Sequence, residues 1–162
     1  MIRDVTLEDA QAICDIYNYY ISDTVITFEE LVINSAEIAK RIRAVQQANL
    51  PWFVFESSSG EILGYAYATK WRERFSYRFS VEITVYLCPK QAGKGLGTQL
   101  YKALFASLKS KDIHSVIGGI TLPNEASVAI HEKFGMSKVA HFKEVGYKFD
   151  QWLDVGYWQG TL

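Results

Sequence analysis

The stretch CPKQAGKGLGTQLYKALFASL, residues 88–108, decides which fold and which kind of site to expect. Gly93, Gly95 and Gly97 stand at alternate positions, directly before a helical pattern. The apolar ridge of that helix recurs every four residues, at Leu96, Leu100, Leu104 and Leu108. Backbone without Cβ atoms can approach a ligand closely, and the free N–H groups of a helix N-terminus bind phosphate. The stretch therefore predicts a phosphate-binding or pyrophosphate-binding loop. The alternative is a flexible turn that uses glycine only for its backbone angles.

Two common nucleotide-binding motifs do not fit these glycines. A Walker A loop needs Ser or Thr after its Gly-Lys pair, but Lys94 is followed by Gly95, and no glycine stands five positions before Gly93. A Gly-x-Gly-x-x-Gly dinucleotide fingerprint fails because Thr98 occupies its last position. What remains is a row of backbone donors at a helix start.

The preceding run SVEITVYL, residues 80–87, alternates as a strand does. Val81, Ile83, Val85 and Leu87 form one face, and Ser80, Glu82, Thr84 and Tyr86 form the other. If this strand is central, its Glu82 carboxylate is held inside, which is costly unless the group is solvated, paired or used in chemistry. The alternative is the exposed face of an edge strand. The aromatic and basic segment WRERFSYRF, residues 71–79, suggests a pocket wall beside Glu82 and favours the functional interpretation.

The remaining segments predict an α/β domain. Strands are expected at residues 1–5, 52–57, 61–70, 114–120, 136–142 and 151–159, the last two antiparallel to each other. Helices are expected from Thr6 with Asp9 in a capping box, from Asn34 to about Asn49, and over 125–134. One buried face of the first helix should hold Leu7, Ala10, Cys14, Tyr17 and Ile21. The order β-α-α-β-β-β-α-β-α-β-β indicates a mixed sheet with helices packed on its faces.

Composition limits the function classes. The chain has 162 residues, a net charge of -1 and a pI near 6.3, which predicts one domain over residues 1–162 and no nucleic-acid partner. Cys14 and Cys88 cannot form a disulfide framework, and no metal-type spacing occurs. No signal peptide or apolar membrane span is present, so we expect a cytoplasmic protein without membrane contact.

Several segments of the chain resemble a known family. AGKGLG, residues 92–97, after VEITVYLCPK is similar to the acyl-CoA pyrophosphate loop of the GNAT acetyltransferases. Within that superfamily, four segments resemble the phosphinothricin and methionine sulfoximine N-acetyltransferase branch. They are IYNYYISDTVITFEE (16–30), WRERFSYRFSVEITVYL (71–87), LPNEASVAIHEKFGM (122–136) and KFDQWLDVGYWQ (148–159). Two positions depart from the superfamily pattern: Ala92 replaces an Arg or Gln, and His131 replaces the tyrosine that protonates the leaving thiolate in many members.

The resemblance implies a single GNAT domain, with a mixed, mostly antiparallel twisted sheet and helices on both faces, that forms a homodimer. It implies acetyl transfer from acetyl-CoA to the α-amino group of a small amino-acid-like substrate, without a metal. The cofactor-binding positions it implies are Val85, Tyr86, Leu87, Ala92, Gly93, Lys94, Gly95, Leu96, Gly97, Thr98 and Asn124. Asn124, at a helix start, is expected to orient the pantetheine arm.

The residues fit this chemistry. An amine of pKa about 10.4 is almost entirely protonated at pH 7 and cannot attack, so a base is required, and Glu82 can serve. Backbone N–H groups between Val85 and Leu87 could stabilise the oxyanion that forms. His131 could protonate the departing thiolate near neutral pH, although a lone histidine in an amphipathic helix is often structural.

The segment 71–79 is expected to select the substrate, together with Glu82. Arg72 and Arg74 would share a face of an extended segment and converge on one carboxylate or phosphinate, while Phe75 and Tyr77 exclude water. The alternative is a solvated surface loop whose arginines pair with acids such as Glu73.

Two other function classes share the acyl-CoA loop. A protein N-terminal or ribosomal acetyltransferase would need an open groove rather than a walled pocket. A non-catalytic acyl-CoA sensor would bind acetyl-CoA without turnover.

Overall fold

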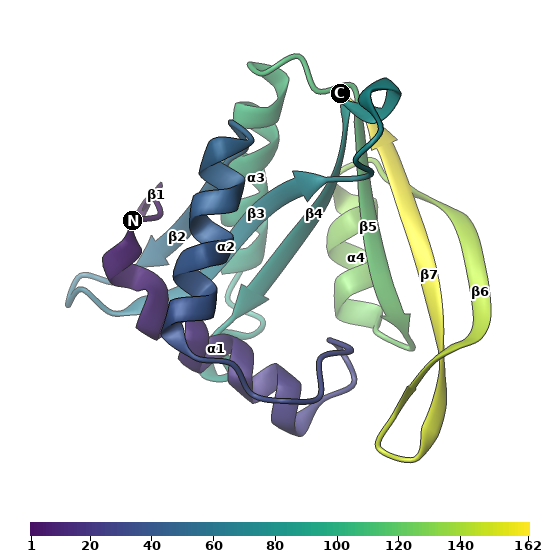
Figure 1. The fold of residues 1–162 in the computed structure, drawn as a ribbon, viewed down its shortest axis with the longest axis horizontal. Coiled ribbons are helices and arrows are strands. Elements are labelled where there is room, and N and C mark those ends of the chain that lie inside the picture. Colours follow the sequence, from purple (N-terminus) through teal and green to yellow (C-terminus); the bar gives the residue numbers. More distant parts are fainter.

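The computed structural model describes all 162 residues and contains one seven-stranded sheet and four helices (Figure 1). The strands are β1 (Ile2–Asp4), β2 (Trp52–Glu56), β3 (Ile62–Lys70), β4 (Ser80–Leu87), β5 (Ser115–Leu122), β6 (Ser137–Lys148) and β7 (Gln151–Thr161). The helices are α1 (Ala10–Asp23), α2 (Ser35–Gln47), α3 (Leu96–Lys109) and α4 (Glu125–Lys133). The predicted order of elements and the mixed, mostly antiparallel sheet are confirmed.

The strand pairing is parallel at the centre of the sheet and antiparallel elsewhere. Its strand order is β1-β2-β3-β4-β5-β7-β6, and every neighbouring pair is antiparallel except β4 and β5. These two parallel strands are paired only from Ser80 to Glu82 on β4 and from Ser115 to Ile117 on β5. Beyond Glu82 they separate, so that the second half of β4 has a neighbour on one side only.

Helices cover both faces of the sheet, as expected. In Figure 1, α1 and α2 lie in front of β2–β4, and α3 and α4 lie behind the sheet. Each face has its own apolar core. One is built by α1 and α2 with residues such as Ile13, Ile42 and Trp52, and the other is built around Leu100 and Leu104 of α3. The leucine ridge thus packs as its spacing predicts.

Local predictions about helix starts hold. The Asp9 carboxylate accepts the Thr6 backbone N–H at 2.8 Å, as in a capping box. Asn34 caps α2 by accepting the Glu37 N–H at 3.0 Å. Cys14 is buried in the α1 core, as its position on the apolar stripe predicted.

Two local expectations are wrong. Leu7 is 40% exposed, because a 3₁₀ turn over Leu7–Asp9 precedes α1 and carries this side chain off the buried stripe. The segment 71–79 is not extended, because it bends and then forms a 3₁₀ turn over Phe75–Tyr77. The premise that placed Arg72 and Arg74 on one face therefore fails.

No helix is both long and apolar enough to cross a membrane. The structure also contains no group of three or more His, Cys, Asp or Glu side chains placed to hold a metal ion.

Candidate active site

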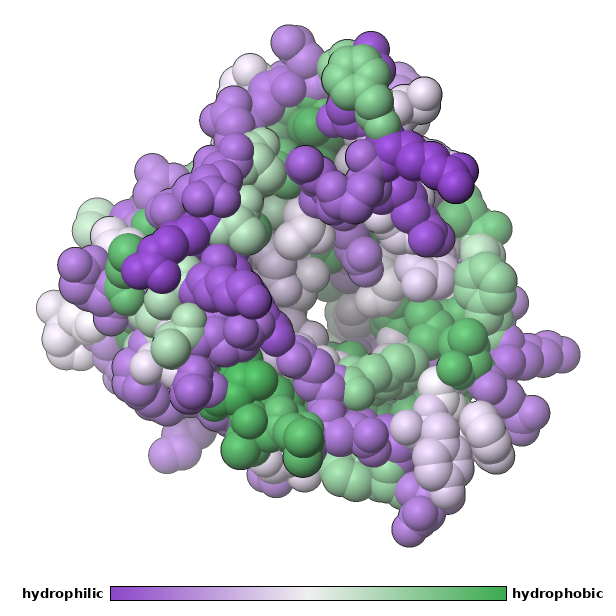
Figure 2. Space-filling model, in the orientation of Figure 1, coloured by the Kyte–Doolittle hydropathy of each residue, from purple (hydrophilic) through white to green (hydrophobic).

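The separation of β4 from β5 opens a cavity of about 280 Å³ with Glu82 in its wall. Figure 2 shows the molecule hollowed at its centre, where β4 and β5 diverge in Figure 1. Several site residues predicted from distant parts of the sequence meet here. Glu82, Val85, Tyr86, Asn124 and His131 all line the cavity. The tertiary structure thus brings the expected base, the expected proton source and the strand backbone together.

Glu82 lies on a central strand, with β3 on one side and β5 on the other, which rules out the edge-strand alternative. Its side chain is half-buried and has no ion-pair partner within 4.0 Å. Burial raises the pKa of the Glu82 carboxyl, and the positive charge of Arg72 opposes that rise. A carboxylate with a raised pKa and no committed partner is suited to accept a proton.

The backbone of β4 offers free donors on the side where β5 has separated from it. Cys88 donates its N–H to the Leu63 carbonyl at 2.8 Å, which fixes the alternation of the ladder with β3. The backbone N–H groups of Thr84 and Tyr86 therefore also point toward β3. The N–H groups of Val85 and Leu87 point the other way, into the gap that β5 leaves. Such donors suit a developing oxyanion.

The glycine stretch lines a second, adjoining groove of about 520 Å³. It shares Val85, Tyr86 and Asn124 with the Glu82 cavity, so the two form one continuous site. Of the predicted cofactor positions, the groove is lined by Val85, Tyr86, Leu87, Ala92, Gly93, Gly95, Gly97, Thr98 and Asn124. Two are not part of its wall: Lys94 donates to the Gln91 side-chain amide at 3.0 Å, and Leu96 is buried.

The glycines have separate physical roles. Gly93 and Gly95 adopt positive φ angles of 77° and 78°, which a residue with a Cβ rarely adopts. Gly95 is the N-cap of α3. Gly97 lies inside the helix, where a Cβ would stand 3.1 Å from the Ile130 side chain of α4. The first two glycines shape the loop, and the third lets α3 and α4 approach.

Asn124 is the N-cap of α4 and His131 lies within that helix, on the far side of the gap from β4. The Asn124 side-chain oxygen accepts the Ser127 N–H at 3.1 Å and caps the helix, which leaves its amide N–H groups for a ligand.

His131 is buried, which lowers its pKa and keeps the ring neutral at pH 7. Its Nδ1 lies 2.6 Å from the Ser127 carbonyl, which can only accept, so Nδ1 carries the proton. Nε2 then accepts a hydrogen bond from the Tyr101 hydroxyl at 3.1 Å. This tautomer has no free proton to donate directly to a thiolate, contrary to the expectation that His131 carries one near neutral pH.

The Gly118-Gly119 pair of β5 lies beside the cavity and was not among the residues predicted from the sequence. A Cβ at Gly118 would collide with the His131 ring, and a Cβ at Gly119 would stand 3.3 Å from Glu82 Oε1. Both glycines keep space beside a predicted catalytic side chain. Two adjacent glycines inside a strand are the signal that could have found them, because glycine weakens a strand unless something approaches it closely.

Only some of the predicted substrate-binding residues of segment 71–79 lie near the site. Arg72 and Tyr77 line a cavity between segment 71–79 and the β6–β7 pair, and Arg72 is close enough to lower the Glu82 pKa. Arg74 and Phe75 line neither this cavity nor the one with Glu82, and Phe75 is 77% exposed. Because the segment bends, the two guanidinium groups do not share a face.

The connection between α1 and α2, residues 24–34, supplies wall residues that sequence analysis did not single out. Ile26, Thr27 and Phe28 line the Glu82 cavity, and Ile26 also lines the groove. The apolar content of this long connection, TVITF at 24–28, was the available signal, because exposed loops are seldom so apolar.

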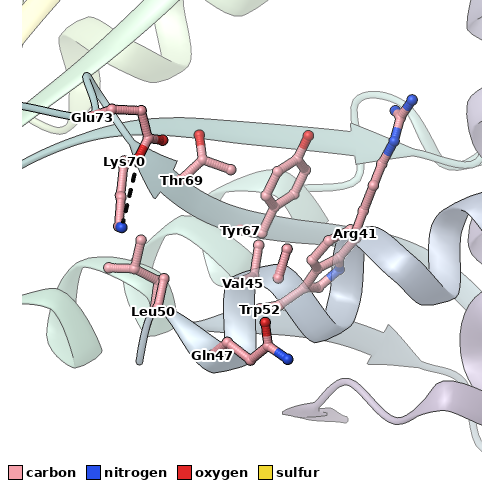
Figure 3. Close-up of a pocket in the computed structure, with 11 residues that line it drawn as sticks. Arg41, Val45, Gln47, Leu50, Trp52, Tyr67, Thr69, Lys70 and Glu73 are labelled. Atoms are coloured by element: carbon pink, nitrogen blue, oxygen red, sulfur yellow. Dashed lines mark ion pairs between the residues drawn. The ribbon is translucent and has the colours of Figure 1, made fainter.

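A separate cavity of about 480 Å³ lies between α2 and β3, against Trp52 and Tyr67 (Figure 3). It contains none of the predicted site residues. Its two cations face acids, since Arg41 pairs with Glu29 and Glu37, and Lys70 lies 3.9 Å from Glu73. The candidate active site is therefore the β4–β5 gap and not this cavity.

The acetyltransferase (GNAT) domain family matches residues 2–156 of this chain. The chain belongs to the GNAT acetyltransferase family. This GNAT protein is accordingly an acetyl-CoA-dependent N-acetyltransferase.

Three relatives place the GNAT chain more closely. It is 33% identical to the L-methionine sulfoximine/L-methionine sulfone acetyltransferase of Pseudomonas paraeruginosa, over 99% of this chain and 94% of that protein. It is 32% identical, with a TM-score of 0.97, to a phosphinothricin acetyltransferase from Sinorhizobium meliloti solved in complex with acetyl-CoA; the match covers 100% of this chain and 88% of that one. A ribosomal-protein-alanine N-acetyltransferase from Brucella melitensis is 30% identical with a TM-score of 0.97, covering 100% and 99%.

Proposed function

We propose that this enzyme, a single domain over residues 1–162, acetylates the α-amino group of a small amino-acid-like substrate of the phosphinothricin, methionine sulfone or methionine sulfoximine type, which carries an acid group. The observation that carries the proposal is that the cavity with Glu82 and the groove of the glycine loop share wall residues. A cavity of about 280 Å³ with the Glu82 carboxylate in its wall adjoins the glycine-lined groove. A volume of that order accommodates an amino acid rather than a folded protein terminus.

In the proposed reaction, Glu82 takes a proton from the substrate ammonium, directly or through water. The free amine attacks the thioester carbonyl, and the N–H groups of Val85 and Leu87 stabilise the oxyanion. The C–S bond then breaks, and the thiolate takes up a proton. That proton is the second one that the amine nitrogen loses as it becomes an amide. We propose that the Tyr101 hydroxyl, 3.1 Å from His131 Nε2 in the cavity wall, relays it by turning from Nε2 to the sulfur while it accepts the proton from the nitrogen.

The Brucella relative motivates the competing hypothesis, acetylation of a protein N-terminus. A thiol-release assay with acetyl-CoA should compare free amino acids, including phosphinothricin and methionine sulfone, with peptides that begin with Ala. We expect turnover with the amino acids and kcat/KM at least 100-fold lower for the peptides. The opposite ranking would support a protein substrate, and acetyl-CoA binding without any turnover would indicate a sensor.

Arg72 is proposed to hold the acid group of the substrate. Arg72→Ala should raise KM for an anionic acceptor by roughly 10- to 150-fold, the value of one charged hydrogen bond. Because the Arg72 charge lowers the Glu82 pKa, the same variant should also move the acid limb of the pH–rate profile to higher pH. Steady-state kinetics from pH 5 to 9 measure both effects.

The matched control is Arg78→Ala, in the same segment, whose guanidinium stacks on Phe75 and Phe79 at 4.1 and 4.4 Å from their ring centroids. It should change KM by less than threefold. A neutral amine without an acid group should react equally with wild type and Arg72→Ala. If both acceptors lose equally, Arg72 supports the fold instead. Arg74→Ala tests the second arginine, for which we propose a smaller effect.

We further propose that the enzyme is a homodimer. β6 is an edge strand, and its Val139, Phe142 and Val145 side chains are 56%, 52% and 59% exposed. Exposed apolar side chains on an edge strand invite pairing with another chain. Sedimentation equilibrium should give twice the 18.4 kDa chain mass, and Val145→Glu should shift the protein to monomer. A monomeric wild type would refute the proposal.

A further inference from the structure

Lys148, the last residue of β6, is buried, and the one carboxylate whose charge raises its pKa, that of Glu30, lies beyond ion-pair distance. Its side chain is 1% exposed, and the structure contains no ion pair for it within 4.0 Å. Lysine is almost never fully buried unless it is paired. The ammonium donates one hydrogen bond, to the Thr27 carbonyl at 2.9 Å, and lies 5.0 Å from the Phe149 ring centroid. Burial of an ammonium group with so few partners costs folding free energy, which raises the question of what the contact to Thr27 achieves.

The β6–β7 turn presents Lys148 to the connection between α1 and α2. Phe149 and Asp150 adopt positive φ angles of 51° and 56°, as in a two-residue hairpin turn. Two residues before Lys148, Gly146 leaves room for Phe28, because a Cβ there would collide with the Phe28 ring. The end of β6 therefore holds both Thr27, by its carbonyl, and Phe28, by its ring.

The held residues belong to the active site. Thr27 and Phe28 line the cavity that contains Glu82, and neither lines the groove of the glycine loop. On its other side, the Thr27 hydroxyl lies 2.7 Å from the Tyr17 hydroxyl of α1. Thr27 is thus held between α1 and the hairpin, and its backbone depends on the Lys148 bond.

We propose that Lys148 is a positioning residue for the acceptor substrate: it holds Thr27 and Phe28 against the acceptor cavity from the end of β6, 121 residues away in sequence. This inference rests on the proposed function, because it concerns the acceptor of that same reaction. It adds a residue that contacts neither substrate nor cofactor, and it predicts that binding of the acceptor depends on the hairpin while binding of acetyl-CoA does not.

Lys148→Met removes the donor and keeps most of the side-chain stem. We expect KM for the amino-acid acceptor to rise about tenfold, the loss of one charged hydrogen bond, with kcat and KM for acetyl-CoA within twofold of wild type. The matched control is Lys138→Met on the same strand, whose exposed ammonium contacts the His141 ring and lies 5.5 Å from the Trp158 ring centroid, away from Thr27 and Phe28. It should leave all three constants unchanged. Equal rises in both KM values would overturn the proposal.

Amide hydrogen–deuterium exchange tests the contact without any substrate. In Lys148→Met, residues 25–30 should exchange at least tenfold faster, while α3 and β4 exchange as in wild type. Gly146→Ala, which displaces Phe28, should give the same pattern and serves if Lys148→Met does not fold. Unchanged exchange at 25–30 in both variants would refute the positioning role. If the wild type acetylates no amino acid, the proposed function fails, and the exchange result still decides whether Lys148 holds this segment.

Discussion

Replacing Glu82 by Gln is expected to lower kcat/KM by roughly 10²–10⁴, the usual effect of removing a positioned general base. Acetyl-CoA binding should stay within twofold, because Glu82 lines the acceptor cavity and not the glycine-lined groove. The amide is nearly isosteric with the carboxyl group, so Gly119, whose absent Cβ leaves space beside Glu82, needs no rearrangement. Thiol-release kinetics and isothermal titration with acetyl-CoA measure the two effects.

The pH dependence follows from the environment of Glu82. Because burial raises its pKa, the carboxyl group is protonated at a pH where an exposed Glu is still ionised. Activity should therefore fall as the pH drops through this raised pKa, above the ordinary value of about 4.3. This acid limb should be absent in Glu82→Gln.

The substitution Glu82→Gln should lower activity but not the free energy of unfolding. A carboxyl group whose pKa is raised in the folded state opposes folding above its unfolded pKa, so Glu82→Gln should be at least as stable as wild type at pH 7. Urea denaturation at pH 7 tests this.

The control for Glu82→Gln is Glu73→Gln, whose side chain is 90% exposed in the neighbouring segment. It should retain full activity. A loss of less than tenfold in Glu82→Gln would assign Glu82 a binding or structural role, and a different group would have to act as the base.

The second large effect is expected at the glycine loop. Acetyl-CoA should raise the melting temperature of wild type, because a ligand that binds only the folded state stabilises it by RT ln(1 + [L]/Kd), about 2.7 kcal/mol at 100 Kd. Gly95→Val should abolish this shift. Gly95 has a φ of 78°, which a β-branched residue resists, and it is the N-cap that starts α3 at the groove. The loop would reshape and withdraw its N–H groups.

Gly60→Val separates backbone strain from loss of the site. Gly60 has a φ of 85°, lies in the turn between β2 and β3, and does not line the groove. Both variants should lose stability, roughly 1–3 kcal/mol each, but Gly60→Val should keep the full acetyl-CoA shift. If Gly95→Val also keeps it, the glycine loop is not the cofactor site.

The sequence alone determined the features that depend on neighbours a few residues apart. The caps at Thr6 and Asn34, the leucine ridge of α3 and the alternation of β4 need only local hydrogen bonds and a repeat of apolar side chains. The same holds for the bare loop before α3, since positive φ angles are a property of Gly93 and Gly95 themselves.

Only the tertiary structure decided which groups meet. Glu82 and His131 share one cavity because β4 and β5 pair over three residues and then separate, which no local pattern encodes. The same long-range packing buries His131 and sets its tautomer, and it brings Lys148 to Thr27. Local patterns report the conformation of a segment, whereas a site is made by pairings between segments far apart in the chain, and these depend on how the whole sheet and its helices pack.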